Sequence, residues 1–343
     1  MAELRETDPD APVRLGRTRL TVTRLGLGTA PLGGLFAPVP APQAHATIER
    51  AYETGLRLFD TAPLYGYGAA ERRLGEVLRR HAPDTGTLAT KVGRLLRAGA
   101  PPDMSQYYKG EPFYHGTPPV NPVFDFSYDG VMRSLDESLE RLGLGRVDIL
   151  HIHDPDNHVP EALAGAYRAL NRLRADGTIA AVGVGTNRPE PVLRFAEEAD
   201  VDCVLLAGRY TLLDQSGLAA LSLCAQRGIA VIAGGVFNSG ILAHPQAGGT
   251  FDYVPADPGV LAKALRLEAV CRRHGVPLAA AAMQFPFSHP AVASVLIGCR
   301  SPAEVDENVR LFCHDISVEL WDELRRDGLI APESPATSEG PLR

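Results

Sequence analysis

The sequence contains little cysteine and tryptophan and has no excess of positive charge. Five cysteines and one tryptophan occur among its 343 residues, and no two cysteines form a Cys-x-x-Cys pair. Scattered cysteines in odd number are typical of reduced, mostly buried thiols in the cytoplasm rather than of a disulfide framework. The formal net charge is −7, which argues against a nucleic acid or an anionic membrane as a partner.

Long hydrophobic runs are also lacking. No stretch reaches the roughly 18 apolar residues that a membrane-spanning helix needs, and residues 1–6 are charged and lack the apolar core of a signal peptide. Hydrophobic residues make up 45% of the chain and charged residues 22%, as in ordinary globular proteins. We therefore expect a cytoplasmic protein that acts on a small molecule, as a monomer or a small homo-oligomer.

Eight short apolar runs alternate with amphipathic segments along the chain. The runs are nearly continuous in hydrophobicity, as expected for strands that are covered on both faces. This alternation predicts an α/β fold, a (β/α)8 TIM barrel with additional C-terminal helices. A doubly wound sheet is the alternative, but the Gly-x-Gly-x-x-Gly turn expected of it is absent. The runs span residues 25–29, 56–60, 88–92, 147–153, 180–185, 203–206, 229–233 and 294–298.

One barrel accounts for residues 14–330, and we expect the tails 1–13 and 331–343, rich in Pro, Glu, Ala and Ser, to be frayed. The connection over residues 93–126 shows no periodicity and holds many Pro, Gly and Tyr residues. Loops of this length usually carry function or are disordered. Because it follows the third predicted strand, we expect it to overhang the barrel mouth as a wall or lid of a substrate pocket. A surface excursion without function is the alternative.

Four chemically active side chains lie at or just after the ends of three predicted strands. In a parallel barrel the carboxyl ends of all strands meet at one mouth, so these side chains can converge on one point. An acid, a phenol, an ammonium group and an imidazole suit proton transfer to or from a carbonyl or alcohol oxygen. The four residues, called the tetrad below, are Asp60, Tyr65, Lys91 and His153.

Each residue of the tetrad is expected to have a distinct role. A free phenol has a pKa of about 10, and a neighbouring ammonium group lowers it, so Lys91 is expected to bring the pKa of Tyr65 toward the working range. A buried lysine needs a counter-charge, and Asp60 is the natural one. His153 is expected to orient the substrate oxygen or to relay the proton.

Two other classes of protein compete with this interpretation. His151 and His153 form a His-x-His pair on one strand, and barrel hydrolases use such pairs as metal ligands. The remaining strand ends offer poor ligands, so no metal site is predicted. A non-enzymatic, cofactor-sensing barrel is the second alternative, and the acidic charge and the absence of an appended domain argue against it.

Several segments resemble the aldo-keto reductase family over nearly the whole chain, from residue 25 to about residue 319. The tetrad lies at the family's catalytic positions without substitution, and the resemblance implies a (β/α)8 barrel that binds a nicotinamide cofactor in extended form. The matching segments are Phe59–Gly66, Thr90–Gly93, Arg133–Gly143, Val147–His153 and Ile297–Ser301, followed by Glu307 and Asn308.

The resemblance also implies a set of cofactor contacts. Thr186 and Asn187 take the place of the Ser-Asn pair that holds the nicotinamide carboxamide, and Ala207 stands where the family usually has glutamine. Tyr210 is expected to flank the nicotinamide ring. The glycine-rich segment 234–242 resembles the loop that covers the pyrophosphate. The remaining expected contacts are Phe237, Asn238, Ser239, Gly240, Leu242, Gly298, Arg300, Glu304, Glu307 and Asn308.

The cofactor and the substrate class follow from the same resemblance. A carboxylate at Glu304 would repel a 2′-phosphate, whereas Arg300 could pair with one, and the balance favours NAD over NADP. The segments 153–156, 237–242 and 281–286 resemble a branch of aldose 1-dehydrogenases and pyridoxal 4-dehydrogenases. In that branch a cyclic hemiacetal is oxidised to a lactone. An aldose of the L-fucose or D-threo type is the expected substrate, with pyridoxal oxidation or general aldehyde reduction as alternatives.

Overall fold

Eight parallel strands form a closed barrel in the computed structural model, which describes residues 8–332. Each strand pairs with its neighbour in chain order, and the eighth strand closes the barrel on the first through pairs from Val295–Leu25 to Gly298–Gly28. The predicted (β/α)8 fold is thus confirmed. The barrel strands are β3 (Leu25–Gly28), β4 (Leu58–Asp60), β5 (Thr87–Val92), β10 (Ile149–His153), β11 (Ala181–Thr186), β12 (Cys203–Ala207), β13 (Ala230–Gly234) and β16 (Val292–Gly298).

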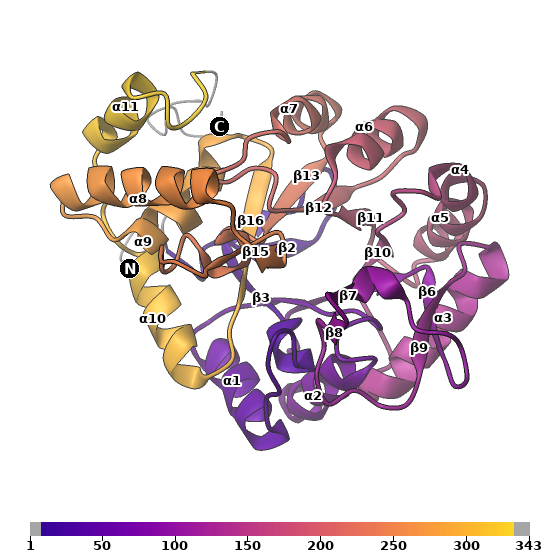
Figure 1. Ribbon diagram of the computed structural model, residues 1–343. Helices are drawn as coiled ribbons and strands as arrows, with labels where there is room; N and C mark the ends of the chain where they lie inside the picture. Colours follow the sequence, from indigo (N-terminus) through magenta and orange to yellow (C-terminus); the bar gives the residue numbers. More distant parts are fainter. Residues whose placement is uncertain (1–7, 333–343) are drawn as a thin grey trace.

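Helices surround the barrel on its outer side (Figure 1). Within residues 8–332, none of them is long and apolar enough to cross a membrane. A π-helical turn over Ala162–Ala166 joins two of them. They are α1 (Ala41–Glu53), α2 (Ala69–Leu78), α3 (Tyr128–Leu142), α4 (Val159–Glu161), α5 (Tyr167–Ala175), α6 (Pro189–Glu198), α7 (Leu218–Arg227), α8 (Pro258–Arg273), α9 (Leu278–Gln284), α10 (Pro302–Phe312) and α11 (Val318–Arg326).

Local sequence sets the ends of these helices, as α3 illustrates. The Ser127 hydroxyl accepts a hydrogen bond from the Gly130 N–H at 3.0 Å, which satisfies one of the free donors of the first turn. Gly143 follows the last turn with φ +60°, a conformation that costs glycine little. The apolar face between these caps, with Val131 and Leu135, is buried.

Alternation along the strands divides the core into an inner and an outer layer. On β10, Leu150 and Ile152 join the large cluster between the barrel and the helices, whereas Ile149 belongs to the cluster inside the barrel. Because side chains alternate with a period of two, His151 and His153 share the inward face of Ile149. The inside of the barrel therefore changes from apolar at the bottom to polar at the mouth.

A hairpin of β1 (Pro12–Arg14) and β2 (Thr21–Thr23) closes the bottom of the barrel. Its Leu15 and Val22 are buried in the inner cluster. The expectation that residues 1–13 are frayed is wrong at Pro12 and Val13, because these residues pair with β2. The rest of that expectation, residues 1–7, and nearly all of the expected C-terminal tail, residues 333–343, lie outside the described residues.

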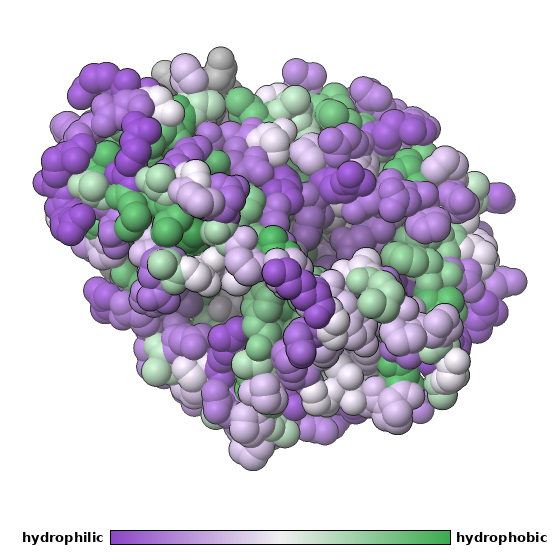
Figure 2. All heavy atoms as spheres, in the orientation of Figure 1, coloured by the Kyte–Doolittle hydropathy of each residue, from purple (hydrophilic) through white to green (hydrophobic). Residues whose placement is uncertain are grey.

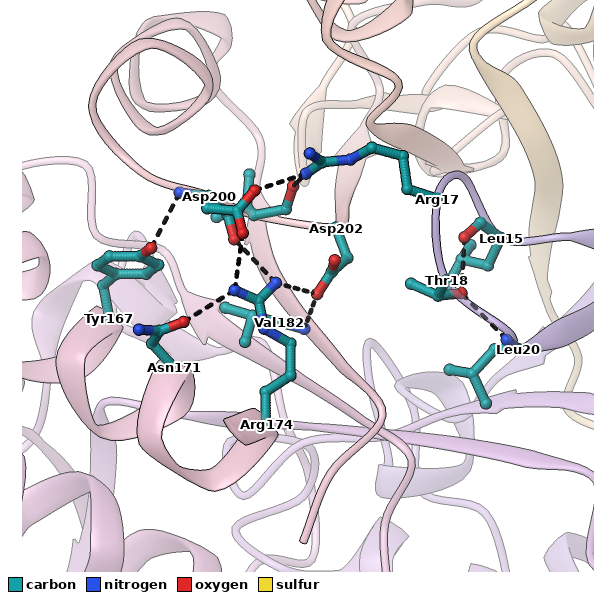
Figure 3. Close-up of polar contacts among 11 residues, drawn as sticks. Leu15, Arg17, Thr18, Leu20, Tyr167, Asn171, Arg174, Val182, Asp200 and Asp202 are labelled. Atoms are coloured by element: carbon teal, nitrogen blue, oxygen red, sulfur yellow. Dashed lines mark hydrogen bonds and ion pairs between the residues drawn. The ribbon is translucent and has the colours of Figure 1, made fainter. Parts of the chain in front are cut away.

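An ion pair links this hairpin to the neighbouring connection from α6 to β12, as Figure 3 shows. Arg17 Nη2 lies 2.8 Å from Asp200 Oδ1, and Arg174 contacts Asp200 Oδ2 at 3.0 Å. The same guanidinium lies 2.7 Å from Asp202 Oδ2, which also accepts the Val182 N–H. These ion pairs stabilise the bottom face of the barrel. In barrels of this kind the active site lies at the opposite face, the mouth.

The connection over residues 93–126 is a set of short hairpins. Strand β6 (Arg94–Arg97) pairs with β9 (Asn121–Phe124), and β7 (Tyr107–Tyr108) pairs with β8 (Glu111–Pro112). The segment is bonded to the loop after β3 through Phe36 N–Phe113 O at 2.7 Å. It covers the barrel mouth, together with the hairpin of β14 (Thr250–Phe251) and β15 (Val254–Pro255) (Figure 1).

Candidate active site

Three members of the tetrad reach the mouth from inward-facing strand positions. Asp60 ends β4, Lys91 lies near the end of β5 and His153 ends β10. The Lys91 ammonium lies 2.5 Å from Asp60 Oδ2, and the two side chains are 1% and 4% exposed. Lys91 Nζ also donates to the Thr61 carbonyl at 2.9 Å. The expected counter-charge of Lys91 is therefore present.

Two glycines place Tyr65, the fourth member, in the turn between β4 and α2. A Cβ on Gly66 would lie 2.2 Å from the Gly33 carbonyl oxygen, and Gly66 has φ +59°. This close backbone contact holds the turn against the loop after β3. The Lys91 ammonium lies 4.7 Å from the Tyr65 ring centroid, and the His153 ring meets that ring edge-on at 5.9 Å. The structure thus brings the tetrad together.

The electrostatics of Tyr65 differ from the prediction. Burial raises the pKa of Tyr65 well above its usual value, and the nearby Asp60 carboxylate raises it further. The expected lowering by Lys91 is absent because the ammonium group is engaged by Asp60 and Thr61. In the protein without cofactor or substrate, the phenol is therefore protonated at neutral pH.

The other two titratable partners are also shifted by burial. Burial raises the pKa of Asp60, and the Lys91 ammonium group opposes this effect. Burial, with help from the charges of Arg94 and Lys91, lowers the pKa of His153 well below its usual value. His153 is accordingly a neutral imidazole, which suits a hydrogen bond to a substrate oxygen.

A cavity of about 690 Å³ opens beside Asp60 and Tyr65 and extends toward α10. We call it the mouth cavity; the side chains at its entrance are part of the face shown in Figure 2. Ala207 and Gly208 line its inner end, where small residues leave room for a planar ring. Ten of the expected cofactor residues line it: Asn187, Phe237, Asn238, Ser239, Gly240, Gly298, Arg300, Glu304, Glu307 and Asn308.

Three expected cofactor contacts do not line the mouth cavity. The Thr186 hydroxyl donates to Asp156 Oδ1 at 2.6 Å, so it is already engaged. Tyr210 is 3% exposed and packs against Phe285, and its hydroxyl lies 3.0 Å from Ser288 Oγ. Leu242 is fully buried in the outer core. These three side chains are engaged within the protein, and their expected contacts with a cofactor stay predictions.

Several residues of the site lack any signal in the sequence. Tyr253, in the two-residue turn of the β14–β15 hairpin, lines the mouth cavity, and its ring packs in a tilted orientation against Phe36 at 5.9 Å and Phe113 at 5.6 Å. Burial raises the pKa of its hydroxyl, and the nearby Asn187 side chain opposes this effect. Strands of two residues are too short for any periodicity, so only the fold reveals this contact.

The polar wall next to His153 was also missed. Asp154 follows His153 directly and binds the Arg94 guanidinium at 2.7 Å. Among residues 8–332 there is no group of three or more His, Cys, Asp and Glu side chains placed to hold a metal ion. His151 is buried beneath the tetrad, and burial lowers its pKa to about 3.

A barrel of this kind, with a tyrosine beside a buried lysine–aspartate pair and a long cavity reaching from it, defines a class of nicotinamide-dependent oxidoreductases. The sequence profile of the aldo/keto reductase family matches residues 24–326. The chain therefore belongs to the aldo/keto reductase family and is an NAD(P)-dependent oxidoreductase. The alternative of a metal-dependent hydrolase is thereby set aside.

Two relatives are similar over most of their length. A pyridoxal 4-dehydrogenase from Microbacterium luteolum is 48% identical over 340 residues, covering 92% of this chain and 97% of the relative. A D-threo-aldose 1-dehydrogenase from a Pseudomonas species is 38% identical, covering 91% and 95%. The branch that the sequence resembled is thus confirmed.

A solved structure shares the fold at low identity. A glycerol dehydrogenase from Gluconobacter oxydans superposes with a TM-score of 0.72 at 23% identity, covering 99% of this chain and all of the other.

Proposed function

We propose that this protein oxidises a cyclic hemiacetal to the corresponding lactone, with Tyr65 as the proton acceptor. The observation that carries the proposal is the placement of Tyr65, which lines the mouth cavity and adjoins the buried Lys91–Asp60 pair. The two similar relatives act on pyridoxal and on D-threo-aldoses by name, and both substrates form cyclic hemiacetals.

The proposed step balances in protons and electrons. The substrate hydroxyl gives its proton to the Tyr65 oxygen, the carbon–hydrogen bond breaks with its electron pair, and a carbon–oxygen double bond forms. The nicotinamide cofactor, when bound, accepts that hydride. Burial keeps Tyr65 protonated in the unliganded protein, so the phenol must lose its proton before it can accept another. We propose that the positive charge of Lys91, 4.7 Å from the Tyr65 ring centroid, favours that loss once the cavity is occupied. Asp60 holds the Lys91 ammonium group at 2.5 Å, and His153 orients the substrate oxygen.

The mouth cavity suits a dinucleotide. Its small residues Ala207 and Gly208 are at the tetrad end, and its polar groups Asn187, Asn238 and Asn308 can donate or accept hydrogen bonds along its length. We propose that Thr186 does not contact the cofactor itself and only positions the neighbouring Asn187. We propose that the adenosine half lies near α10, because Glu304, Glu307 and Asn308 of this helix line the cavity.

We propose NAD as the preferred cofactor. The Glu304 carboxylate lines the cavity at the first turn of α10 and accepts the Arg300 N–H at 2.8 Å. A 2′-phosphate would place further negative charge beside it. The Arg300 guanidinium is directed to the Leu35 carbonyl at 3.2 Å. In calorimetric titrations we expect NAD to bind more tightly than NADP, and Glu304→Gln to narrow the difference. Tighter binding of NADP by the unmodified protein would contradict the proposal.

Two substrates deserve a direct comparison. An aldose is favoured by the polar Arg94–Asp154 pair beside His153. Pyridoxal is favoured by the aromatic rings of Tyr114 and Tyr253 around Tyr65, which suit a planar ring, and by the higher identity to the pyridoxal 4-dehydrogenase. A panel of L-fucose, D-threo-aldoses, pyridoxal and simple aldehydes, scored by kcat/KM, separates them.

The proposal is tested by Tyr65→Phe. This variant should bind NAD normally in calorimetry and lose hydride transfer, because only the reacting hydroxyl is removed. A matched control is Tyr52→Phe, whose hydroxyl contacts Asp84 on the outer side of the barrel. Turnover by Tyr65→Phe within a few-fold of the unmodified protein would refute the assignment. We propose that the reaction takes place in the cytoplasm.

A further inference from the structure

A buried ion pair adjoins the catalytic imidazole and has no part in the proton transfer described above. Asp154 Oδ2 lies 2.7 Å from Arg94 Nη2 and 3.5 Å from His153 Nε2. Arg94 is 4% exposed, and its guanidinium carbon lies 4.4 Å from the Phe124 ring centroid. Neither member of the pair lines the mouth cavity. The pair therefore adjoins the tetrad at His153 and lies outside the cavity proposed for the cofactor.

The backbone and the unused polar atoms show that this site is specifically built. Asp154 has φ +44°, a left-handed conformation that costs free energy for a non-glycine residue. Its N–H is bonded to the Gly185 carbonyl at 2.8 Å, which fixes the conformation. The Arg94 Nε is buried without a hydrogen-bond partner among residues 8–332, and so is His153 Nδ1. A buried pair with unused hydrogen-bonding capacity is costly if it serves packing alone.

The two members of the pair differ in exposure. The Asp154 side chain is 27% exposed, whereas Arg94 lies beneath it at 4%. Both contacts given above use Asp154 Oδ2, and the other carboxylate oxygen, Oδ1, has no hydrogen bond to any residue in 8–332. Oδ1 is therefore the atom that a bound molecule can reach, while Arg94 holds the carboxylate in place.

The carboxylate also lies close to the phenols that surround the reacting oxygen. The charge of Asp154 contributes, after burial, to the raised pKa values of Tyr65, Tyr114 and Tyr253. Asp154 contacts His153 Nε2 at 3.5 Å, and the His153 ring lies 5.9 Å from the Tyr65 ring, so the carboxylate adjoins the reacting site from the His153 side. A substrate whose reacting oxygen lies between Tyr65 and His153 would bring its adjacent substituent to Asp154.

We propose that Asp154, held by Arg94, is a specificity-determining residue that accepts a hydrogen bond from a substrate hydroxyl next to the reacting carbon. This inference rests on the proposed oxidation of a cyclic hemiacetal and narrows its substrates to those with a neighbouring hydroxyl. Aldoses carry such a group at C2, on the carbon bonded to the reacting C1, and pyridoxal carries its 3-hydroxyl one carbon further away, beside the ring carbon that bears the aldehyde. Simple aliphatic aldehydes have none.

The test compares a hydroxylated substrate with its deoxy counterpart. The pairs are an aldose with its 2-deoxy form and pyridoxal with its 3-deoxy form. Asp154→Asn and Asp154→Ala should lower kcat/KM for the hydroxylated member by roughly 10- to 100-fold, the range expected for a hydrogen bond to a charged group. The deoxy member should change only a few-fold. Asp103→Asn is the matched control, because Asp103 lies 3.4 Å from Arg94 Nη1 but, among the described residues, forms no hydrogen bond or ion pair with His153.

Each outcome decides the matter. An equal loss for both members of a pair would mean that Asp154 only supports His153, and it would overturn the inference while leaving the proposed function intact. No oxidation of any of the four compounds by the unmodified protein would refute the proposed function and the inference together. If Asp154→Asn fails to fold because Arg94 keeps only its longer, 3.4 Å contact with Asp103, Arg94→Met combined with Asp154→Asn removes both charges. The loss of preference should be the same in that double variant.

Discussion

Lys91→Met tests the buried pair on which the tetrad depends. The substitution removes the ammonium group and leaves the Asp60 carboxylate without its partner, at a position where the two side chains are 1% and 4% exposed. The variant can lose activity for two reasons: the charge beside Tyr65 is gone, or the mouth of the barrel is destabilised. Combining Lys91→Met with Asp60→Asn separates these reasons, because the double variant leaves neither charge behind.

The separation of 2.5 Å between Lys91 Nζ and Asp60 Oδ2 sets the size of the effect. With an effective dielectric constant of about 20, the Coulomb attraction at that distance is roughly 7 kcal/mol, most of which offsets desolvation. Removing one partner should cost about 3–5 kcal/mol of the free energy of unfolding. The double variant should recover about 2–3 kcal/mol of that loss, which is the coupling energy of a contacting pair.

Urea denaturation at pH 7 measures the stability of Lys91→Met, Asp60→Asn and the double variant, and hydride transfer is followed by nicotinamide absorbance. We expect activity to be lost in all variants that lack Lys91, including the stabilised double variant. Additive losses in the cycle would refute the account of the pair as a mutually dependent buried charge pair. Recovered activity in the double variant would refute the role of Lys91 in assisting Tyr65.

Three further predictions follow from contacts elsewhere. The pKa of His151 is about 3 in the folded protein and 6.5 in its ordinary state, so the unfolded state takes up a proton first as pH falls; the residue should cost about 2 kcal/mol of stability between pH 7 and pH 5. Urea titrations should show that His151→Leu lacks this loss, and an unchanged pH dependence would contradict it. Gly75→Ala should lower the free energy of unfolding by roughly 1–3 kcal/mol, and with it the melting temperature, because the added Cβ would lie 1.8 Å from the Leu142 carbonyl oxygen. A higher melting temperature, as helix propensity alone predicts, would contradict this prediction. Asp252→Asn removes the 2.7 Å pair with Arg209 that holds the β14–β15 hairpin, so stopped-flow release of NAD should become several-fold faster, and an unchanged rate would show that the hairpin does not limit release.

The sequence predicted the structure correctly wherever the regular alternation of apolar runs and amphipathic segments determines it. The apolar runs predicted all eight barrel strands, and their alternation places Lys91 and His153 on the inward face. The convergence of the tetrad then follows from barrel closure alone. Asp60 could be assigned as the partner of Lys91 because no other acid ends a neighbouring strand.

The sequence did not predict in which direction individual side chains point or how deeply they are buried. Thr186 ends β11, but its hydroxyl is bound by Asp156, 30 residues earlier in the connection after β10. Tyr210 packs on Phe285 in the core between the barrel and the helices. The pKa of Tyr65 was predicted to fall because the charges were visible in the sequence, whereas its burial, the larger effect, depends on the surrounding hairpins.

The closure of the barrel between β3 and β16 has a consequence for how the protein is made. Strand β3 is among the first parts of the chain to leave the ribosome, and its second neighbour β16 is among the last. Until then one edge of β3 is unpaired, and exposed strand edges promote aggregation. The hairpin of β1 and β2 buries Leu15 and Val22 only after β12 and β13 exist. Synthesis of this barrel therefore leaves an open sheet for most of translation, and truncations before residue 292 should depend on chaperones for solubility.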